Sequence, residues 1–273
     1  MIIAHLSDLH LDGGQRAEDR VAAVLRYLGG LAEPVGAVVV TGDIADHGTA
    51  EEYARAAALL KYPAPVLVCP GNHDVRGAFR TGLLDRFSGG PGGGAPGPGR
   101  SPGCHSLPAS EEPIDLAQEV DGVLFALCDS TIPGRGAGFL ADETLAWLDG
   151  VLSGGDGPAF VAFHHPPVDV GVPLVDAIRQ SGEDRLAAVL NRHPRVKALL
   201  AGHVHTGAST TFAGVPLRIA PGVVSGSLLP IEPGADRGWA DGGPVEFDRP
   251  PSLLLHVLHD DGRVTSHHRV VSC

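Results

Sequence analysis

The chain begins Met1-Ile2-Ile3-Ala4-His5-Leu6-Ser7-Asp8-Leu9-His10. The apolar run in this stretch predicts a short buried strand, and a carboxylate and an imidazole follow where that strand ends. Side chains two residues apart on an extended segment point to the same face, so Asp8 and His10 can serve one site. Ionised Asp offers oxygen and neutral His offers a nitrogen lone pair. The stretch therefore predicts part of a metal site whose other ligands come from elsewhere in the chain.

The same arrangement recurs along the sequence, because further short apolar runs also end in polar residues that can bind metal. Strands are predicted at residues 2–6, 37–40, 65–69, 123–128, 159–163 and 198–201. Helices are predicted at residues 16–28, 49–60, 77–87, 141–152 and 183–191. The second of these helices begins with a capping box of Thr49 and Glu52. This alternation is typical of a parallel α/β sheet, which binds ligands beyond the carboxyl ends of its strands.

The last third of the chain changes character. Two hairpins are predicted, residues 209–219 and 252–270, with a Gly/Pro-rich stretch, residues 230–251, between them. No helix separates these late strands, so we expect them to form a second, more antiparallel sheet. A flexible Gly/Pro-rich insertion is predicted at about residues 88–113, and a lid is the alternative. No domain boundary is evident, so residues 1–273 are expected to form a single domain.

Composition limits the partners that are expected. The 273 residues carry a net charge of −12, which disfavours a general nucleic-acid binder. A small anionic substrate remains compatible, because bound cations reverse the local field. No segment resembles a secretory signal or a membrane span, so a cytoplasmic protein without membrane association is expected. The four cysteines lack metal-ligand spacing and suggest thiols in a reducing compartment.

The strand ends together supply a set of nitrogen and oxygen donors. The candidate residues are Asp8, His10, Asp43, Asn72, His73, His164, His203 and His205. One such residue alone is usually structural or solvated. Several His and Asp side chains converging at buried strand ends are costly unless they pair or bind metal, so the joint pattern predicts a metal centre. The absence of Cys from these positions favours Mn, Fe or Zn over a thiolate site.

Read in order, these motifs resemble those of the calcineurin-like metallophosphoesterases. They are Asp8-Leu9-His10, Gly42-Asp43-Ile44-Ala45-Asp46, Gly71-Asn72-His73-Asp74, His164 and Gly202-His203-Val204-His205. The outline is most similar to the class III cyclic-nucleotide phosphodiesterases and their glycerophosphodiesterase-like relatives. The resemblance extends to about residue 205. It implies an α/β (α+β) fold of four layers, in which two packed mixed β-sheets are flanked by helices.

The resemblance also implies roles for individual residues. One metal ion would be held by Asp8, His10 and His205, and the other by Asn72, His164 and His203, with Asp43 bridging the two. His73 would be a catalytic histidine that faces the substrate, oriented by Asp46. His164 and His165 compete for one ligand position, and the His-x-Pro pattern favours His164.

Other polar residues in and around the motifs are expected to be structural. Asp74 is interpreted as a cap of the following turn, and His5 as a packed or hydrogen-bonded histidine. The remaining histidines are expected to be structural or on the surface: His47, His193, His256, His259, His267 and His268.

The activity that the resemblance implies is that of a two-metal phosphodiesterase. It would hydrolyse cyclic nucleotides (3',5'-cAMP-like) or other small phosphodiesters, using a hydroxide that bridges the metals. A phosphomonoesterase and a glycerophosphodiesterase of the same family are the alternatives. A non-enzymatic protein-binding scaffold predicts degraded ligands, and the intact set disfavours it. A homodimer is compatible with the resemblance, and the motifs leave the choice of substrate to the pocket walls.

Overall fold

The computed structural model describes residues 1–85 and 111–272. Most of the predicted insertion at about residues 88–113 lies outside the described residues. Its described end, residues 111–113, contributes backbone carbonyls that accept hydrogen bonds from Arg76 and Arg80.

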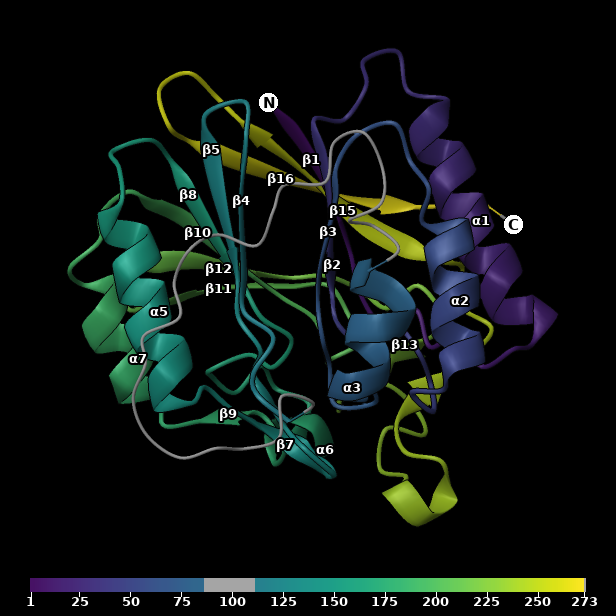
Figure 1. Cartoon of the computed structure of the whole chain (residues 1–273). Coiled ribbons are helices and arrows are strands. Elements are labelled where there is room, and N and C mark those ends of the chain that lie inside the picture. The colour runs from purple at the N-terminus through teal and green to yellow at the C-terminus, as the bar shows by residue number, and fades with distance from the viewer. Residues whose placement is uncertain (86–110, 273) are drawn as a thin grey trace.

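Two β-sheets face each other, and helices cover their outer faces (Figure 1). On one side lie α1 (Gln15–Gly29), α2 (Ala50–Leu59) and α3 (Arg76–Phe79), the last continuing into a π-helical turn, η1 (Arg80–Leu84). On the other side lie α5 (Asp142–Ser153) and α7 (Glu183–Leu190). A short helix, α6 (Pro173–Asp176), precedes α7. These are the four layers that the family resemblance implied.

The first sheet has the strand order β16-β15-β1-β2-β3. The strands β1 (Ile2–Leu6), β2 (Ala37–Thr41) and β3 (Val66–Cys69) are parallel. The hairpin of β15 (Ser252–Leu258) and β16 (Val264–Val270) joins them antiparallel to β1.

The second sheet has the order β11-β12-β10-β8-β5-β4. Its parallel strands are β12 (Val215–Ile219), β10 (Val196–Ala201), β8 (Ala159–Ala162) and β5 (Val123–Leu127). The antiparallel edges are β11 (Ala208–Phe212) and β4 (Leu116–Val120).

Two small sheets of short strands lie outside the two main sheets. A small sheet contains β6 (Thr131–Ile132), β7 (Arg135–Phe139) and β9 (Gln180–Ser181). A second pairs β13 (Gly226–Ser227) with β14 (Val245–Glu246), and a 3₁₀ turn, η2 (Trp239–Asp241), lies between these two strands in sequence.

The predicted assignment of the two late hairpins to one sheet is wrong. The hairpin of β11 and β12 extends the second sheet, whereas the hairpin of β15 and β16 extends the first. Burial explains the difference, because β15 is apolar on both faces: Leu253 and Leu255 pack toward the helices, and Leu258 packs between the sheets. Such a strand needs an interior place, and the free edge of β1 provides one.

The core between the two sheets fixes how they face each other. Ile3 and Val39 of the first sheet pack with Phe125 and Phe160 of the second. The two phenylalanine rings stack with their centroids 5.5 Å apart and their planes at 12°. The run Ala37–Thr41 is buried along its whole length, as expected for a parallel strand covered on both faces.

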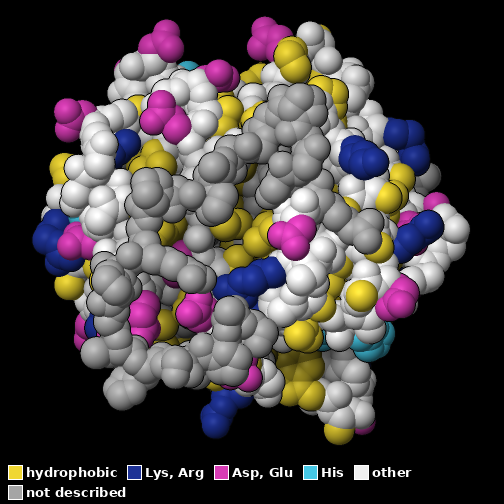
Figure 2. Space-filling view, in the orientation of Figure 1, with side chains coloured by type: hydrophobic (Ala, Val, Ile, Leu, Met, Phe, Trp, Pro, Cys, Tyr) yellow, Lys and Arg dark blue, Asp and Glu magenta, His cyan; other side chains and the backbone are white. Residues whose placement is uncertain are grey.

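The described surface carries charges of both signs. Figure 2 shows acidic and basic side chains interspersed over the described part of one face. Within residues 1–85 and 111–272, no helix combines the length and apolarity needed to cross a bilayer.

Candidate metal centre

The seven predicted metal ligands follow the carboxyl ends of five strands, drawn from both sheets. Asp8 and His10 follow β1, Asp43 follows β2 and Asn72 follows β3. In the second sheet, His164 follows β8, and the pair His203 and His205 follows β10. Because parallel strands end at a common edge, the topology brings these distant segments together.

Backbone hydrogen bonds join the loops that carry the ligands. The amide of His10 donates to the Asp43 carbonyl at 2.9 Å, and the amide of Gly202 donates to the His164 carbonyl at 2.9 Å. The amide of Val224 donates to the Asp8 carbonyl at 3.1 Å. Each loop is therefore held by its neighbour.

The ligand loops also hold an unusual backbone conformation. Among the described residues, seven other than glycine have a positive φ, and five of them are predicted ligands. These five are Asp8 (54°), His10 (40°), Asp43 (48°), His203 (71°) and His205 (56°). Left-handed backbone costs free energy for a residue with a side chain, and it concentrates at functional sites whose surroundings enforce it.

Four donor atoms form a first cluster. The distance from His205 Nε2 to Asp8 Oδ1 is 3.3 Å, and from His205 Nε2 to His10 Nε2 it is 3.2 Å. His10 Nε2 is 3.5 Å from Asp43 Oδ2. Ligand atoms that bind one ion at about 2.0–2.2 Å lie roughly 3.0–3.5 Å from one another. The spacing fits a shared cation.

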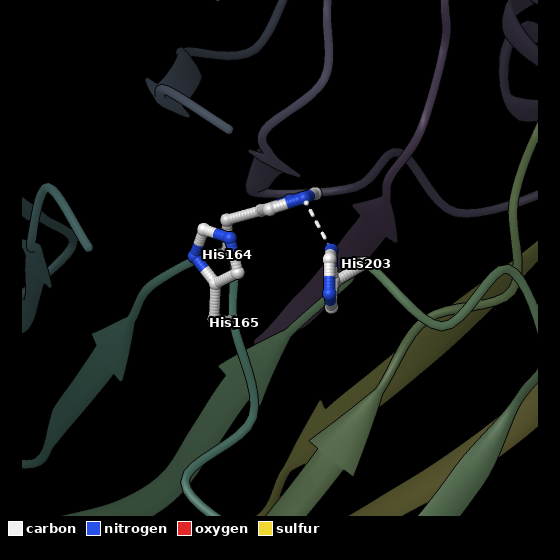
Figure 3. Close-up of side chains that lie close together, drawn as sticks. All are labelled: His164, His165 and His203. Atoms are coloured by element: carbon white, nitrogen blue, oxygen red, sulfur yellow. Dashed lines mark hydrogen bonds between the residues drawn. The ribbon is translucent and has the colours of Figure 1, made fainter. Parts of the chain in front are cut away.

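A second cluster surrounds His164 Nε2. Asn72 Oδ1 lies 3.2 Å from this nitrogen, and Asp43 Oδ2 lies 3.3 Å from it. His203 Nδ1 is 3.3 Å away, and Figure 3 shows the two imidazoles meeting at this contact. Asp43 Oδ2 belongs to both clusters, which is the position of a bridging carboxylate.

Outer partners orient three of the four predicted histidine ligands. His164 Nδ1–H donates to the Thr41 carbonyl at 2.7 Å, so its Nε2 carries the lone pair. His10 Nδ1–H donates to Asp46 Oδ1 at 2.8 Å, and His205 Nδ1 lies 2.7 Å from Ser225 Oγ. Such partners fix the ring orientation of metal-binding histidines. Ser225 was not predicted, because no local pattern marks a serine that follows its partner by 20 residues.

The electrostatics of the site call for positive charge. Asp8 Oδ1, which lies in the first cluster, is buried with no hydrogen-bond partner among the described residues. Burial lowers the pKa of His164, but Asp43 and Asp8 outweigh it and raise that pKa to about 9. Without another cation, a proton is drawn onto the nitrogen that faces Asp43 and Asn72. The donor set therefore fits two divalent or trivalent cations, which would supply the positive charge that the proton otherwise provides.

His73 lies beside the clusters with its side chain 41% exposed. Its Nδ1–H donates to the backbone carbonyl of Asp46 at 2.9 Å, whereas the Asp46 carboxylate is 3.4 Å away. That carboxylate is closer to His10, at 2.8 Å. The main chain of Asp46 is therefore the nearer partner of His73, while its side chain is nearer to His10, and a role of Asp46 in orienting His73 stays a prediction.

The structure separates His164 from His165. The three imidazoles of His164, His165 and His203 are close enough to form a metal-binding group. Both ring nitrogens of His165 have other partners, however: Nδ1 lies 2.8 Å from Ser130 Oγ, and Nε2–H donates to the Gly136 carbonyl at 3.1 Å. Burial and the neighbouring His164 lower the pKa of His165 to about 3. His165 therefore anchors the segment around β6 and β7.

Asp74 is structural, but it does not cap the following turn. Its carboxylate accepts hydrogen bonds from the amides of Gly71, Ile44 and Ala45. The Tyr53 hydroxyl donates to it at 3.0 Å. Helix α3 begins without a side-chain cap. Asp74 thus ties the loop after β3 to the loop after β2.

Histidines outside the motifs are placed as expected where the structure gives their partners. His5 is buried and bonded to His256 and Thr41. His193 contacts Asp149 at 2.7 Å, and the exposed His47 contacts Glu52 at 2.8 Å.

Comparisons with known proteins agree with this picture. The family model for calcineurin-like phosphoesterases matches residues 1–207. A probable cyclic nucleotide phosphodiesterase of Rhodococcus erythropolis is 33% identical over 86% of this chain and 75% of its own length. A glycerophosphodiester phosphodiesterase of Enterobacter lignolyticus is 31% identical over 94% of this chain and 86% of its own.

A solved structure shows the same fold. The dimetal phosphatase of Danio rerio superposes with a TM-score of 0.62 at 16% identity, covering 100% of this chain and 99% of that one. The family match spans every predicted ligand, from Asp8 to His205. The chain therefore belongs to the calcineurin-like phosphoesterase family.

Proposed function

We propose that this metal-dependent phosphoric ester hydrolase is a phosphodiesterase for cyclic nucleotides or other small phosphodiesters. The relatives that carry the proposal are named as a probable cyclic nucleotide phosphodiesterase and a glycerophosphodiester phosphodiesterase. Both names describe diester cleavage, which favours a diester over a phosphomonoester substrate.

One observation supports the two-metal assignment above the others. Asp43 Oδ2 lies 3.5 Å from His10 Nε2 and 3.3 Å from His164 Nε2, so a single oxygen adjoins both clusters. Asp43 Oδ1 accepts a hydrogen bond from the His73 amide at 2.9 Å, which fixes the carboxylate. In this proposal Asp8, His10 and His205 hold one cation, Asn72, His164 and His203 hold the other, and Asp43 bridges them.

Two bound cations would acidify a water and offset the charge on the phosphoryl oxygens. The chain's own residues orient this centre and handle protons. Thr41 and Asp46 fix the imidazoles of His164 and His10. His73 has its Nδ1–H engaged by the Asp46 carbonyl, which leaves Nε2 free to exchange a proton with the leaving oxygen.

Manganese, iron and zinc all suit this nitrogen and oxygen donor set, and we propose a transition-metal pair from among them. A small phosphodiester is the proposed partner, without nucleic acid or membrane. A homodimer and a cytoplasmic location remain part of the proposal.

The test is Asp43→Asn, assayed on bis(p-nitrophenyl) phosphate and p-nitrophenyl phosphate with each metal. Asn keeps the shape of Asp but loses the charge that two cations share, so diester turnover should fall on the order of 100-fold or more. Asp156→Asn, at an exposed carboxylate, is the matched control and should leave turnover unchanged. Wild-type metal content should be two ions per chain by elemental analysis.

Undiminished turnover in Asp43→Asn would refute the two-metal assignment. Faster turnover of the monoester than of the diester by the wild-type chain would instead point to a phosphomonoesterase. Cyclic nucleotides and glycerophosphodiesters, compared under the same conditions, separate the two diester classes.

A further inference from the structure

A row of polar side chains crosses the otherwise apolar space between the sheets. Thr41 Oγ1 lies 2.9 Å from His5 Nε2, and His5 Nδ1 lies 3.1 Å from His256 Nε2. His256 Nδ1 lies 2.8 Å from Ser266 Oγ, and Arg218 Nε–H donates to that hydroxyl at 3.3 Å. The row thus passes through β2, β1, β15 and β16 and ends on β12 of the other sheet.

When both imidazoles are neutral, the hydrogen bonds in this row run in one direction because its two ends are fixed. Arg218 Nε–H donates to Ser266 Oγ, and the Thr41 hydroxyl donates to the Leu6 carbonyl, which leaves Thr41 Oγ1 only lone pairs for His5. Ser266 Oγ accepts from Arg218 and donates its own hydrogen to His256 Nδ1. His256 must then carry its hydrogen on Nε2.

The same reasoning continues inward. His256 Nε2–H donates to His5 Nδ1, so His5 carries its hydrogen on Nε2 and donates it to Thr41 Oγ1. The Thr41 hydroxyl in turn points toward the Leu6 carbonyl, 3.4 Å away. Every donor in the row has an acceptor when both imidazoles are neutral and in this tautomer.

The surroundings favour the neutral state of both histidines. Each is 0% exposed. Burial, and then the partner His256, hold the pKa of His5 well below its usual range. Burial, and then Arg218, lower the pKa of His256 to about 3. A second proton on either ring would set two donors against each other.

The inner end of the row lies under the candidate metal centre. The Thr41 carbonyl accepts from His164 Nδ1–H at 2.7 Å and from Ser7 Oγ–H at 2.9 Å. Hydrogen bonds in a buried chain polarise one another and restrain the groups they join. A restrained Thr41 therefore restrains the ring of His164.

We infer that His5, His256 and Arg218 form a one-way hydrogen-bond relay that positions Thr41 and, through it, the metal-facing imidazole of His164. These are positioning residues rather than catalytic ones, and the inference rests on the proposed function for its consequence at the metal. The relay itself can be observed without any metal.

The first test is nuclear magnetic resonance of metal-free protein labelled with ¹⁵N-histidine. His5 and His256 should both appear as neutral Nε2–H tautomers from about pH 5.5 to 8.5. In Arg218→Met, which removes the directing donor at the half-buried end, His256 should lose its single tautomer. A charged ring, or Nδ1–H on either histidine in the wild type, would overturn the relay.

The second test uses competition with a chelator to measure the affinity for the cation proposed to be held by Asn72, His164 and His203, which we call the second cation. Thr41→Val removes the hydroxyl with little change of shape, and the affinity should fall about tenfold. Thr41→Ser retains the hydroxyl and should restore the wild-type value. Leu258→Ala is the control, since it removes a buried side chain from the same space between the sheets but no part of the relay.

Leu258→Ala should lower the melting temperature and leave the affinity unchanged. Equal losses of metal affinity in Thr41→Val and Leu258→Ala would show that the row only stabilises the fold, which would overturn the positioning role. Wild-type metal affinity in Thr41→Val would also overturn that role. A wild-type chain that binds no second ion would refute the proposed function, and with it this role, while the tautomer signals still report on the relay.

Discussion

Ser225 illustrates how a residue outside the motifs shapes the site. Its Oγ lies 2.7 Å from His205 Nδ1, and the amide of its neighbour Val224 bonds the Asp8 carbonyl. The segment after β12 therefore contacts the side chain of one predicted ligand, His205, and the backbone of another, Asp8. With Nδ1–H of His205 bonded to this hydroxyl, Nε2 presents its lone pair to Asp8 and His10.

We predict that Ser225→Ala weakens binding of the cation that Asp8, His10 and His205 are proposed to hold by about tenfold, because loss of such a partner frees the ring of His205. The control is Ser227→Ala, a buried serine of β13 two residues further on. Affinity is measured by chelator competition. Equal affinities of the two variants would show that the hydroxyl does not orient His205.

Sequence reasoning at the residue scale succeeded where strand ends coincide with motifs. All seven predicted ligands lie in the two clusters, although their role as ligands stays a prediction. The His-x-Pro pattern of the family favoured His164 over His165, but apart from this resemblance the two adjacent residues share every local signal. Only the tertiary positions of Ser130, Gly136 and Thr41 show which ring is engaged elsewhere and which faces the site.

At the scale of the elements, the backbones of the loops after β2 and β3 pass very close to each other. A Cβ on Gly71 would lie 2.2 Å from Asp43 Oδ1 and 2.4 Å from the Asp43 amide nitrogen. A Cβ on Gly42, whose φ is +86°, would meet His164 Nδ1 at 2.6 Å. Glycine is therefore required where these loops cross.

Gly71→Ala should displace Asp43, abolish binding of at least one cation and lower the free energy of unfolding by about 1–3 kcal/mol. Gly150→Ala is the matched control, because a Cβ there meets nothing within 4 Å in helix α5. That change should instead stabilise the protein by about 0.5–1 kcal/mol. Urea unfolding gives the free energy of unfolding of both variants, and elemental analysis gives their metal content. Full metal content in Gly71→Ala would contradict the prediction.

The major parallel strands and the longer helices were predictable because their apolar runs and caps are local signals. The capping box of Thr49 and Glu52 is present as predicted. The strand β4 was missed, because Leu-Ala-Gln-Glu-Val is half-exposed and carries little apolar pattern. Local sequence patterns also could not predict which sheet β15 joins, since that depends on which sheet edge remains open after the other strands have paired.

At the scale of the whole molecule, one carboxyl group should make stability depend on pH. Asp115 accepts hydrogen bonds from the Asp129 amide at 2.9 Å and the Thr144 hydroxyl at 2.8 Å. Burial raises the pKa of Asp115 to about 7, above the ordinary value of 3.8. The folded state thus keeps a proton that the unfolded chain releases, and the free energy of unfolding falls as pH rises from about 4 to 7.

Asp115→Asn removes this ionisation, so its free energy of unfolding relative to the wild type should rise by about 1–2 kcal/mol between pH 5 and pH 7. Urea unfolding at several pH values provides the measurement. Glu119→Gln, at an exposed position on β4, is the control and should parallel the wild type. Parallel curves for Asp115→Asn and the wild type would show that Asp115 titrates near its ordinary pKa.

Each proposed cation has ligands from both sheets, and His10 and His205 are separated by 195 residues in the sequence. The loops of the first sheet supply Asp8, His10, Asp43 and Asn72, which emerge early from the ribosome during synthesis. The remaining ligands emerge only after most of the chain has been made. Neither coordination sphere can close before then, so metal binding would come late in synthesis and would join loops from the two sheets.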